Sequence, residues 1–465
     1  MKQISASVEV LSQDEILLIH KSALALLEKT GVHVPNAECL KRCKKAGANV
    51  DIQTEVVKIP SAVMEDMIAE MRRESNYKPK SVNKLSGGIS TQVFVTDYKS
   101  KTKRRGVTDD ILKGIQLVKH LKNIPGCSAV TLPSDVDSRV NDLYTYKLIY
   151  TYSQKDGGTY IINPGAADYI IDMAEAMGRK VAYLFETISP LRLRRETLDM
   201  GLRFADRGHP LGIGPMIMGG STGPITMAGT LTLITAETLA SLFAVKAVSG
   251  KNPNCFAQGS HTTDMKTMLC SFGSPNQALI GIGAAQMGNF YGIPAGGNAA
   301  LSDALAADFQ CGFEKTFSAV FSMLAGCVFV GCQGIAGADQ GFCFEQLVLD
   351  NEWIDAYNYT ISGYEVTEES IALELMQEVG IGGNFLAEEH TVEHLSDSWW
   401  KSGLFDRFSF EAWENDGKRE LLDKAAALVD VYTEGYRDME PVVSGKIIDD
   451  LERIYEAGKK AAGVE

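Results

Sequence analysis

Several common catalytic and nucleotide-binding signatures are missing from this chain, and each absence removes a class of function. There is no G-x-S-x-G nucleophile elbow, no P-loop, and no G-x-G-x-x-G after a predicted strand. These absences argue against serine hydrolases, P-loop proteins and Rossmann-type dinucleotide enzymes. None of the nine scattered cysteines has C-x-x-C spacing, so we expect reduced thiols rather than disulfides or a cysteine metal site.

Targeting and membrane signals are also missing. The first residues lack the basic-then-apolar pattern of a signal peptide, and no uninterrupted apolar run reaches the ~18 residues of a membrane span. We therefore expect a cytoplasmic protein that does not enter a membrane. The net charge of −14 lies in the C-terminal part, where residues 361–465 carry 24 acidic and 10 basic side chains. An acidic surface argues against nucleic acid as a partner.

Short apolar runs alternate with helical patterns from residue 108 onward, which predicts a parallel sheet. With an eighth strand near 334–338, a closed (β/α)8 TIM barrel fits this length better than an open sheet. We expect N-terminal helices and a hairpin over 1–107, the barrel over 108–360 and an acidic helical extension packed on it over 361–465. The other predicted strands are 127–132, 159–163, 181–186, 211–216, 255–257, 292–295 and 327–332.

Helix boundaries are marked by local signals. Ser12 and Glu15 form a capping-box pattern that predicts a helix over 12–29. Pro224 and Gly250 bracket a helix with only two charged residues, which must be covered on more than one face. The C-terminal helices, a second subunit or both would supply that cover. The basic run 99–105 fits a solvated hairpin tip better than a docking patch.

Small, polar, glycine-rich loops follow the predicted strands. In a parallel barrel such loops gather at the catalytic mouth, where glycine lets a ligand approach the backbone. Together they predict a wide, open mouth. The loops cover residues 163–165, 186–190, 215–221, 258–260, 296–298 and 333–334.

A possible metal motif lies outside this barrel. His390, Glu393 and His394 match H-x-x-E-H, the helical pattern of some zinc peptidases. Because a five-residue pattern with two free positions occurs often by chance, we favour a structural role and expect no tightly bound metal. Zinc hydrolysis through His390 and His394 is the least favoured alternative.

Two segments combine carboxylates with aromatic residues. Residues 303–315 and 340–353 place both kinds of side chain beside glycine-rich strand ends. Aromatic faces and carboxylates attract an organic cation without donating a proton. This composition favours a pocket for a cationic organic ligand.

Ordered motifs along nearly the whole chain resemble those of the trimethylamine methyltransferase family, which works with a separate corrinoid protein. The resemblance implies a TIM barrel and a methyl acceptor, cob(I)alamin, on a partner protein or free in solution. The motifs include K-T-G-V at 29–32, K-A-G-A-N-V-D at 45–51, L-P-S-D-V-D at 132–137, S-P-L-R at 189–192, S-T-G-P at 221–224, G-F-E-K at 312–315, E-Q-L-V at 345–348, H-T at 390–391 and D-R at 406–407.

Trimethylamine enzymes of that family contain pyrrolysine, whereas this chain has ordinary residues throughout; the corresponding position falls between Gly331 and Phe342. A quaternary amine is already cationic and leaves as a neutral tertiary amine, so it needs no such residue. The resemblance therefore implies a quaternary-amine methyltransferase, with glycine betaine first and proline betaine or carnitine next. A catalytically silent betaine- or corrinoid-binding paralogue is the alternative from another class.

On this interpretation the protein supplies position and environment rather than proton transfer. Asp308 and Glu314 would balance the cationic charge, unless they are structural. An aromatic cage would surround the N-methyl groups, unless its rings only pack the last barrel helix. Backbone and side-chain donors near the Pro224 helix would hold the carboxylate. The predicted cage is Phe342, Phe344, Trp353 and Tyr357, and the predicted carboxylate ligands are Ser221, Thr222, His261 and Asn298. A homo-oligomer is also expected.

Overall fold

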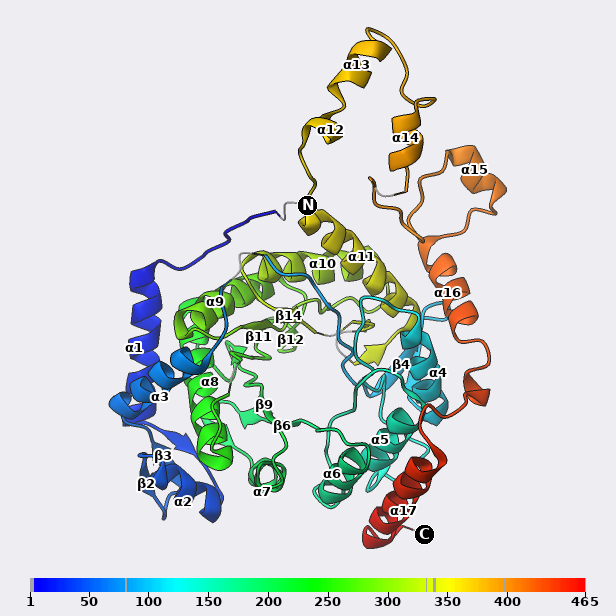
Figure 1. The fold of residues 1–465 in the computed structure, drawn as a ribbon. Coiled ribbons are helices and arrows are strands. Elements are labelled where there is room, and N and C mark those ends of the chain that lie inside the picture. The colour runs from blue at the N-terminus through cyan, green and yellow to red at the C-terminus, as the bar shows by residue number, and fades with distance from the viewer. Residues whose placement is uncertain are drawn as a thin grey trace.

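The computed structural model describes residues 4–79, 82–253, 255–331, 333–337, 340–396 and 398–464. The fold is mixed α/β, with a ring of helices around short inner strands (Figure 1). The strands of the described residues form five small sheets, so the structure contains no single continuous barrel sheet.

The N-terminal part combines three helices with two small strand groups. The β4–β5 hairpin confirms the predicted solvated tip, since every residue of β5 is exposed. The helix predicted over 12–29 is also confirmed, including the Ser12–Glu15 capping box. The elements are α1 (Gln13–Lys29), β1 (Val32–His33), α2 (Ala37–Lys45), β2 (Asn49–Asp51), β3 (Val56–Lys58), α3 (Ser61–Glu74), β4 (Phe94–Asp97) and β5 (Thr102–Arg105).

The ring helices alternate with inner strands much as the sequence predicts. The helices are α4 (Thr108–Lys119), α5 (Asn141–Tyr152), α6 (Ala167–Ala176), α7 (Arg195–Asp206), α8 (Met227–Ser249), α9 (Pro275–Tyr291), α10 (Phe309–Leu324) and α11 (Phe344–Ser362). The strands are β6 (Tyr183–Phe185), β7 (Thr187–Ile188), β8 (Arg192–Leu193), β9 (Leu211–Ile213), β10 (Met218–Gly219), β11 (His261–Thr263), β12 (Cys270–Ser271), β13 (Gly296–Gly297), β14 (Phe329–Val330) and β15 (Gly341–Phe342).

Parallel contacts connect successive inner segments around the ring. No strand pairing joins residues 159–163 to β6 within the described part of the chain. The ring is therefore interrupted at that one junction. The contacts join Gln92 with Thr131, Ala129 N–H with the Gly158 carbonyl, β6 with β9, β10 with β11, Phe256 with Ala295, β13 with β14, and Gln333 with Ile89.

The eighth strand predicted over 334–338 is wrong for residues 334–337, the part of it that the structure describes. Ala338, and Cys332 in the strand predicted over 327–332, lie outside the described residues. Gly334 and Gly337 have positive φ values of 80° and 96°, which turn the chain back so that Ile335 pairs antiparallel with Phe342. Residues 88–92 instead lie beside Gln333, at the position in the ring where the predicted eighth strand was expected. The ring thus includes residues from the expected N-terminal extension.

Helix α8 is covered by N-terminal elements rather than by the C-terminal helices. Helices α1, α2 and α3 pack against it. It starts at Met227 instead of Pro224 because the Thr226 side chain caps it, accepting from the Gly229 N–H. α8 is long and apolar enough to cross a membrane, but 83% of its most apolar window is buried inside the protein. Its composition is that of a core helix.

The C-terminal part first leaves the ring and then returns to it (Figure 1). Helix α16 packs on α11 and α4, and α17 packs on α5 and α6. The Thr367 side chain caps α12, and Ala372, with φ 51°, separates α12 from α13. The elements are α12 (Glu368–Ile371), α13 (Leu373–Val379), α14 (Glu389–His394), α15 (Phe410–Asn415), α16 (Leu421–Tyr432), η1 (Tyr436–Asp438) and α17 (Gly445–Ala461).

Candidate functional site

A cavity of 1220 Å³ opens where the ring of inner segments is interrupted. Residues 88–93, 156–162 and 179–184, with Glu186 and Gly331, line most of it. Along the segment 181–186, Val181, Tyr183 and Phe185 are buried, whereas the alternate residues are more exposed. This period of two turns Leu184 and Glu186 toward the opposite face, where they line the cavity. We call this space the central cavity.

The central cavity combines aromatic, apolar and acidic side chains with two basic ones, Arg179 and Lys180. Tyr160 is 44% exposed, lines the cavity, and its hydroxyl lies 3.5 Å from the Ser90 hydroxyl. Ile162 adds apolar surface. Burial raises the pKa of the Glu186 carboxyl, and the charge of Arg194 partly offsets this rise. A cavity lined by both an aromatic ring and a half-buried carboxylate favours binding of an organic cation.

Glu186 differs from the other acidic residue that lines the cavity. Asp156 pairs with Arg179 at 2.9 Å and is largely exposed. Among the described residues, Glu186 forms no ion pair within 4 Å. Its negative charge therefore remains available to a cationic ligand, whereas that of Asp156 is neutralised.

His261, the first residue of β11, and Asn298, which follows β13, were both predicted as substrate ligands and lie side by side, but neither lines the central cavity. The Asn298 amide nitrogen is 2.6 Å from His261 Nε2, and Phe272 packs edge-on against the imidazole. Burial lowers the pKa of His261 to about 4, so the ring is neutral at pH 7. Nearby, Gln258 Nε2 and Thr263 Oγ1 are buried without a hydrogen-bond partner. Such atoms require water or a ligand polar group.

Ser221 and Thr222 lie in a tight turn several residues before α8. Their N–H groups both donate to the Met218 carbonyl, at 3.0 and 2.9 Å. The Thr222 hydroxyl accepts from the Met218 N–H at 2.9 Å. Because the helix begins at Met227, these residues do not lie at its N-terminus as the sequence suggested. Their hydrogen bonds instead stabilise the turn.

Asp308 and Glu314 both organise the start of α10. Asp308 caps the helix by accepting from the Cys311 N–H. The Glu314 carboxylate accepts from the Ser302 hydroxyl at 2.7 Å, the Asp303 N–H at 2.8 Å and the Gln310 amide at 2.9 Å. The contacts of both carboxylates hold the loop before α10.

The four predicted cage aromatics are buried and do not surround one open space. Phe342 and Phe344 pack edge to face, with ring centroids 5.1 Å apart. Trp353 donates from Nε1 to Asp350 at 2.8 Å, and the Tyr357 hydroxyl donates to the Asn83 carbonyl at 3.1 Å. None of the four lines the central cavity. Their contacts are those of core residues.

Asp350, the partner of Trp353, belongs to a fully buried ion pair. Lys315 Nζ lies 3.0 Å from Asp350 Oδ2 and both side chains are 0% exposed. Asp350 also accepts from the Gly334 N–H at 2.7 Å and from Gln346 at 2.9 Å. Lys315 donates to the Ile335 carbonyl at 3.2 Å. The pair therefore connects α10 and α11 to the chain that turns at Gly334.

Removing the Trp353 ring should affect stability more than ligand binding. We expect Trp353→Ala to lower the free energy of unfolding by ~3–5 kcal/mol, since it creates a cavity and removes a donor to buried Asp350. Chemical denaturation and calorimetric titration with glycine betaine on the same variant measure both effects. Trp353→Phe, which keeps a ring and loses the hydrogen bond, is the matched control. A folded Trp353→Ala protein with unchanged stability and sharply weaker binding would return Trp353 to the site.

The H-x-x-E-H motif lies on α14, far along the C-terminal part. The His390 and His394 rings have centroids 4.5 Å apart, and His394 is exposed. The described residues contain no group of three or more His, Cys, Asp or Glu side chains placed to hold a metal. Among the described residues, therefore, no third side chain is placed beside the two imidazoles as a zinc site requires.

Neither Tyr160 nor Glu186 was among the predicted site residues, although Glu186 begins the loop 186–190 that was expected at the barrel mouth and Tyr160 lies in the predicted strand 159–163. The useful signal was alternation within 181–186, where a glutamate occupies the face opposite to Val181, Tyr183 and Phe185. A carboxylate that ends an apolar strand on its inner face is a stronger site signal than an aromatic residue on a helix.

Comparison with known proteins identifies the relatives of this chain. Residues 1–463 match the family described as trimethylamine methyltransferase (MTTB). The chain belongs to this family. It is accordingly a methyltransferase. This assignment confirms the resemblance seen in the motifs and accounts for nearly the whole chain.

Two relatives illustrate the substrates of named members. The trimethylamine methyltransferase MttB of Desulfitobacterium hafniense is 26% identical, covering 97% of this chain and 94% of the relative. A glycine betaine methyltransferase of D. hafniense strain Y51 is also 26% identical, covering 92% of each. The solved structure of HydG, a maturase of the [FeFe]-hydrogenase, aligns over 96% of this chain with a TM-score of 0.39 and 10% identity, which is too weak a likeness to support an assignment.

Proposed function

We propose that the protein transfers a methyl group from a quaternary amine to cob(I)alamin, supplied by a corrinoid protein or free in solution. Glycine betaine is the first candidate substrate, followed by proline betaine and carnitine. The observation that carries this proposal is that Tyr160 and Glu186, which forms no ion pair among the described residues, both line the central cavity. Membership of a methyltransferase family with a glycine betaine member supports it.

The chemistry of the leaving group favours a quaternary amine. Nucleophilic displacement at its methyl carbon releases a neutral tertiary amine, so no acid has to protonate the leaving group. The chain then has to bind the cation, orient one N-methyl group and exclude water. Tyr160 and Glu186 are the proposed cation ligands. Asn298 and neutral His261 remain proposed ligands of the carboxylate, although neither lines the central cavity.

The corrinoid is proposed to approach the central cavity from the side of the ring where the loops that follow the inner strands lie. Its amide-bearing edge requires donors and acceptors. Ser90 and Gln92 line the central cavity, while Ser134 and Ser138 line an adjoining cavity of 590 Å³ that shares Val93 and Leu132 with it. These residues fit such an edge. When bound, a reduced corrinoid supplies the nucleophile that accepts the methyl group.

The architecture that we propose for this chemistry is an interrupted (β/α)8 barrel. The parallel contacts follow one another around the ring, with the chain from 88 to 92 as the first inner segment. The division into 1–107, 108–360 and 361–465 remains a proposal for the main units of the chain.

A neutral analogue of the substrate tests the cation site directly. Glycine betaine and 3,3-dimethylbutyrate have the same shape and carboxylate, but only the first carries a positive nitrogen. We expect calorimetry to show at least ~30-fold weaker binding of 3,3-dimethylbutyrate, the equivalent of one cation–π contact of ~2 kcal/mol. Equal affinities for glycine betaine and 3,3-dimethylbutyrate would show that the protein has no cation site.

Affinity for the amine should also depend on pH through Glu186. Because burial raises the pKa of this carboxyl, it becomes neutral at a higher pH than an ordinary glutamate does. We expect the dissociation constant for glycine betaine to rise as pH falls through this raised pKa. The substitution Glu186→Gln should flatten the profile. A profile that persists unchanged in Glu186→Gln would assign the titration to another group.

A further inference from the structure

Residues 364–396, which include α12, α13 and α14, form an arm that projects beyond the ring of helices (Figure 1). None of these three helices contains a buried residue. The arm nevertheless carries large exposed apolar side chains, among them Tyr364, Leu373, Ile381 and Leu386, the last 79% exposed. A segment of this composition has no core of its own, so its apolar side chains require a covering surface.

The exposed apolar surface of the arm is large enough for a stable interface. Ten of its large apolar side chains are exposed. Together they present on the order of 1,000 Å² of surface, compared with the ~800 Å² that each partner contributes to a standard interface. The arm also carries eight acidic and no basic residues, so a suitable receptor surface has to be apolar with little negative charge.

Helix α10 provides such a receptor. Phe309, Phe313, Phe317 and Phe321 follow one another at four-residue spacing, with ring centroids 6.1, 5.3 and 4.8 Å apart. We call this row the phenylalanine stripe. Phe309 is 87% exposed, and Phe313 and Phe321 are exposed as well. Helix α10 has only two charged residues, Glu314 and Lys315, of which Lys315 is buried.

We propose that this protein forms a two-fold dimer in which the arm of each copy packs on the phenylalanine stripe of the other. This exchange buries both exposed apolar surfaces of the chain, the arm and the phenylalanine stripe, at the same time. A two-fold arrangement closes the assembly because each copy donates one arm and receives one. The proposal concerns the outer surface and is independent of the methyl-transfer chemistry.

Single charges at the two surfaces test the exchange. Phe313→Glu places a carboxylate in the stripe and Leu386→Glu places one in the arm. Because both positions are exposed, we expect each variant to fold, with a circular dichroism spectrum like that of the wild type. Light scattering coupled to size-exclusion chromatography should show a wild-type dimer and two monomeric variants, with association weakened ~100-fold or more. Ile52→Glu, at an exposed position outside both surfaces, should remain dimeric.

Mixing the two variants gives the decisive result. A heterodimer of Phe313→Glu and Leu386→Glu contains one intact contact, between the arm of the first and the stripe of the second. We therefore expect a mixed dimer in native mass spectrometry although each variant alone is monomeric. A monomeric wild-type protein, a variant that keeps the wild-type mass, or a mixture without heterodimer would each overturn the proposal. A monomeric wild type whose stripe variant loses transfer to a corrinoid protein would assign the stripe to that protein.

Discussion

Replacing Lys315 with methionine should lower the free energy of unfolding by ~3–5 kcal/mol, the usual cost of leaving one member of a buried ion pair without its partner. The substitution keeps an unbranched side chain, one atom shorter, and removes the charge facing Asp350, which is 0% exposed. The remaining donors to Asp350, from Gly334, Gln346 and Trp353, do not replace a full positive charge. Urea denaturation of both proteins measures the difference.

An exposed ion pair provides the control for this experiment. Arg453 pairs with Asp450 at 2.9 Å, with its side chain 72% exposed. Arg453→Met should therefore change stability by less than ~1 kcal/mol. The double substitution Lys315→Met with Asp350→Leu removes both buried charges and should recover part of the loss. Similar small effects of Lys315→Met and Arg453→Met would contradict the structural role of the buried pair.

Replacing Glu186 with glutamine should weaken binding of a quaternary amine by ~30–100-fold. A unit charge a few ångströms from the ammonium, in a half-buried site, contributes ~2–3 kcal/mol. Stability at neutral pH should rise slightly. The reason is that a raised carboxyl pKa reflects a cost of burying the ionised form, a cost present above that pKa and relieved as pH falls through it. Titration calorimetry and thermal unfolding measure the two effects.

Asp156→Asn is the matched control for Glu186→Gln. Asp156 lines the same cavity, but its charge is neutralised by Arg179 and its side chain is largely exposed. We expect its substitution to change amine affinity by less than threefold. If both variants lose affinity equally, the effect belongs to the overall charge of the cavity rather than to Glu186.

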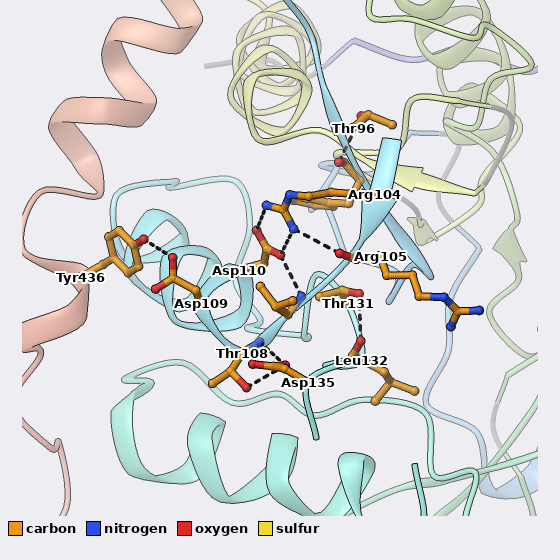
Figure 2. A network of polar contacts seen from close by, with 12 residues as sticks. Thr96, Arg104, Arg105, Thr108, Asp109, Asp110, Thr131, Leu132, Asp135 and Tyr436 are labelled. Carbon is orange, nitrogen blue, oxygen red and sulfur yellow. Dashed lines mark hydrogen bonds and ion pairs between the residues drawn. The ribbon is translucent and has the colours of Figure 1, made fainter. Parts of the chain in front are cut away.

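A close view of the segment between β5 and α4 shows why local signals predict some contacts and not others (Figure 2). Asp110 lies in the first turn of α4 and caps it by accepting from the Val107 N–H, which a sequence pattern can suggest. The two 2.7 Å bonds from Arg104 to the same carboxylate, and the Tyr436 bond to Asp109, join residues from different elements. Only the folded chain brings these groups together.

The inner segments show the same limit on a larger scale. Apolar runs located 181–186 and 211–216 well, because burial of one strand face leaves a clear pattern. The pattern does not say which segment closes the ring, and Ile89 rather than residues 334–338 pairs beside Gln333. Positive φ angles at Gly334 and Gly337 depend on the turn that the surrounding structure imposes.

Candidate site residues were harder to predict than elements. Trp353 and Tyr357 have the composition of a cation cage, but helical spacing turns them toward Asp350 and Asn83. His261 and Asn298, both expected as carboxylate ligands, lie next to each other in the structure, a contact that their positions in the sequence do not reveal. Sequence identifies which residues can bind a cation, whereas the direction of each side chain decides which ones face the cavity.

The ratio of methyl-transfer efficiencies for glycine betaine and trimethylamine tests the central claim most directly. Purified protein is mixed with cob(I)alamin and each amine, and kcat/KM is obtained from the change in the absorption spectrum of the corrinoid. We predict transfer from glycine betaine that exceeds transfer from trimethylamine by at least ~100-fold, because only the quaternary amine releases a neutral leaving group without assistance. Efficient transfer from trimethylamine, with little or none from quaternary amines, would contradict the account.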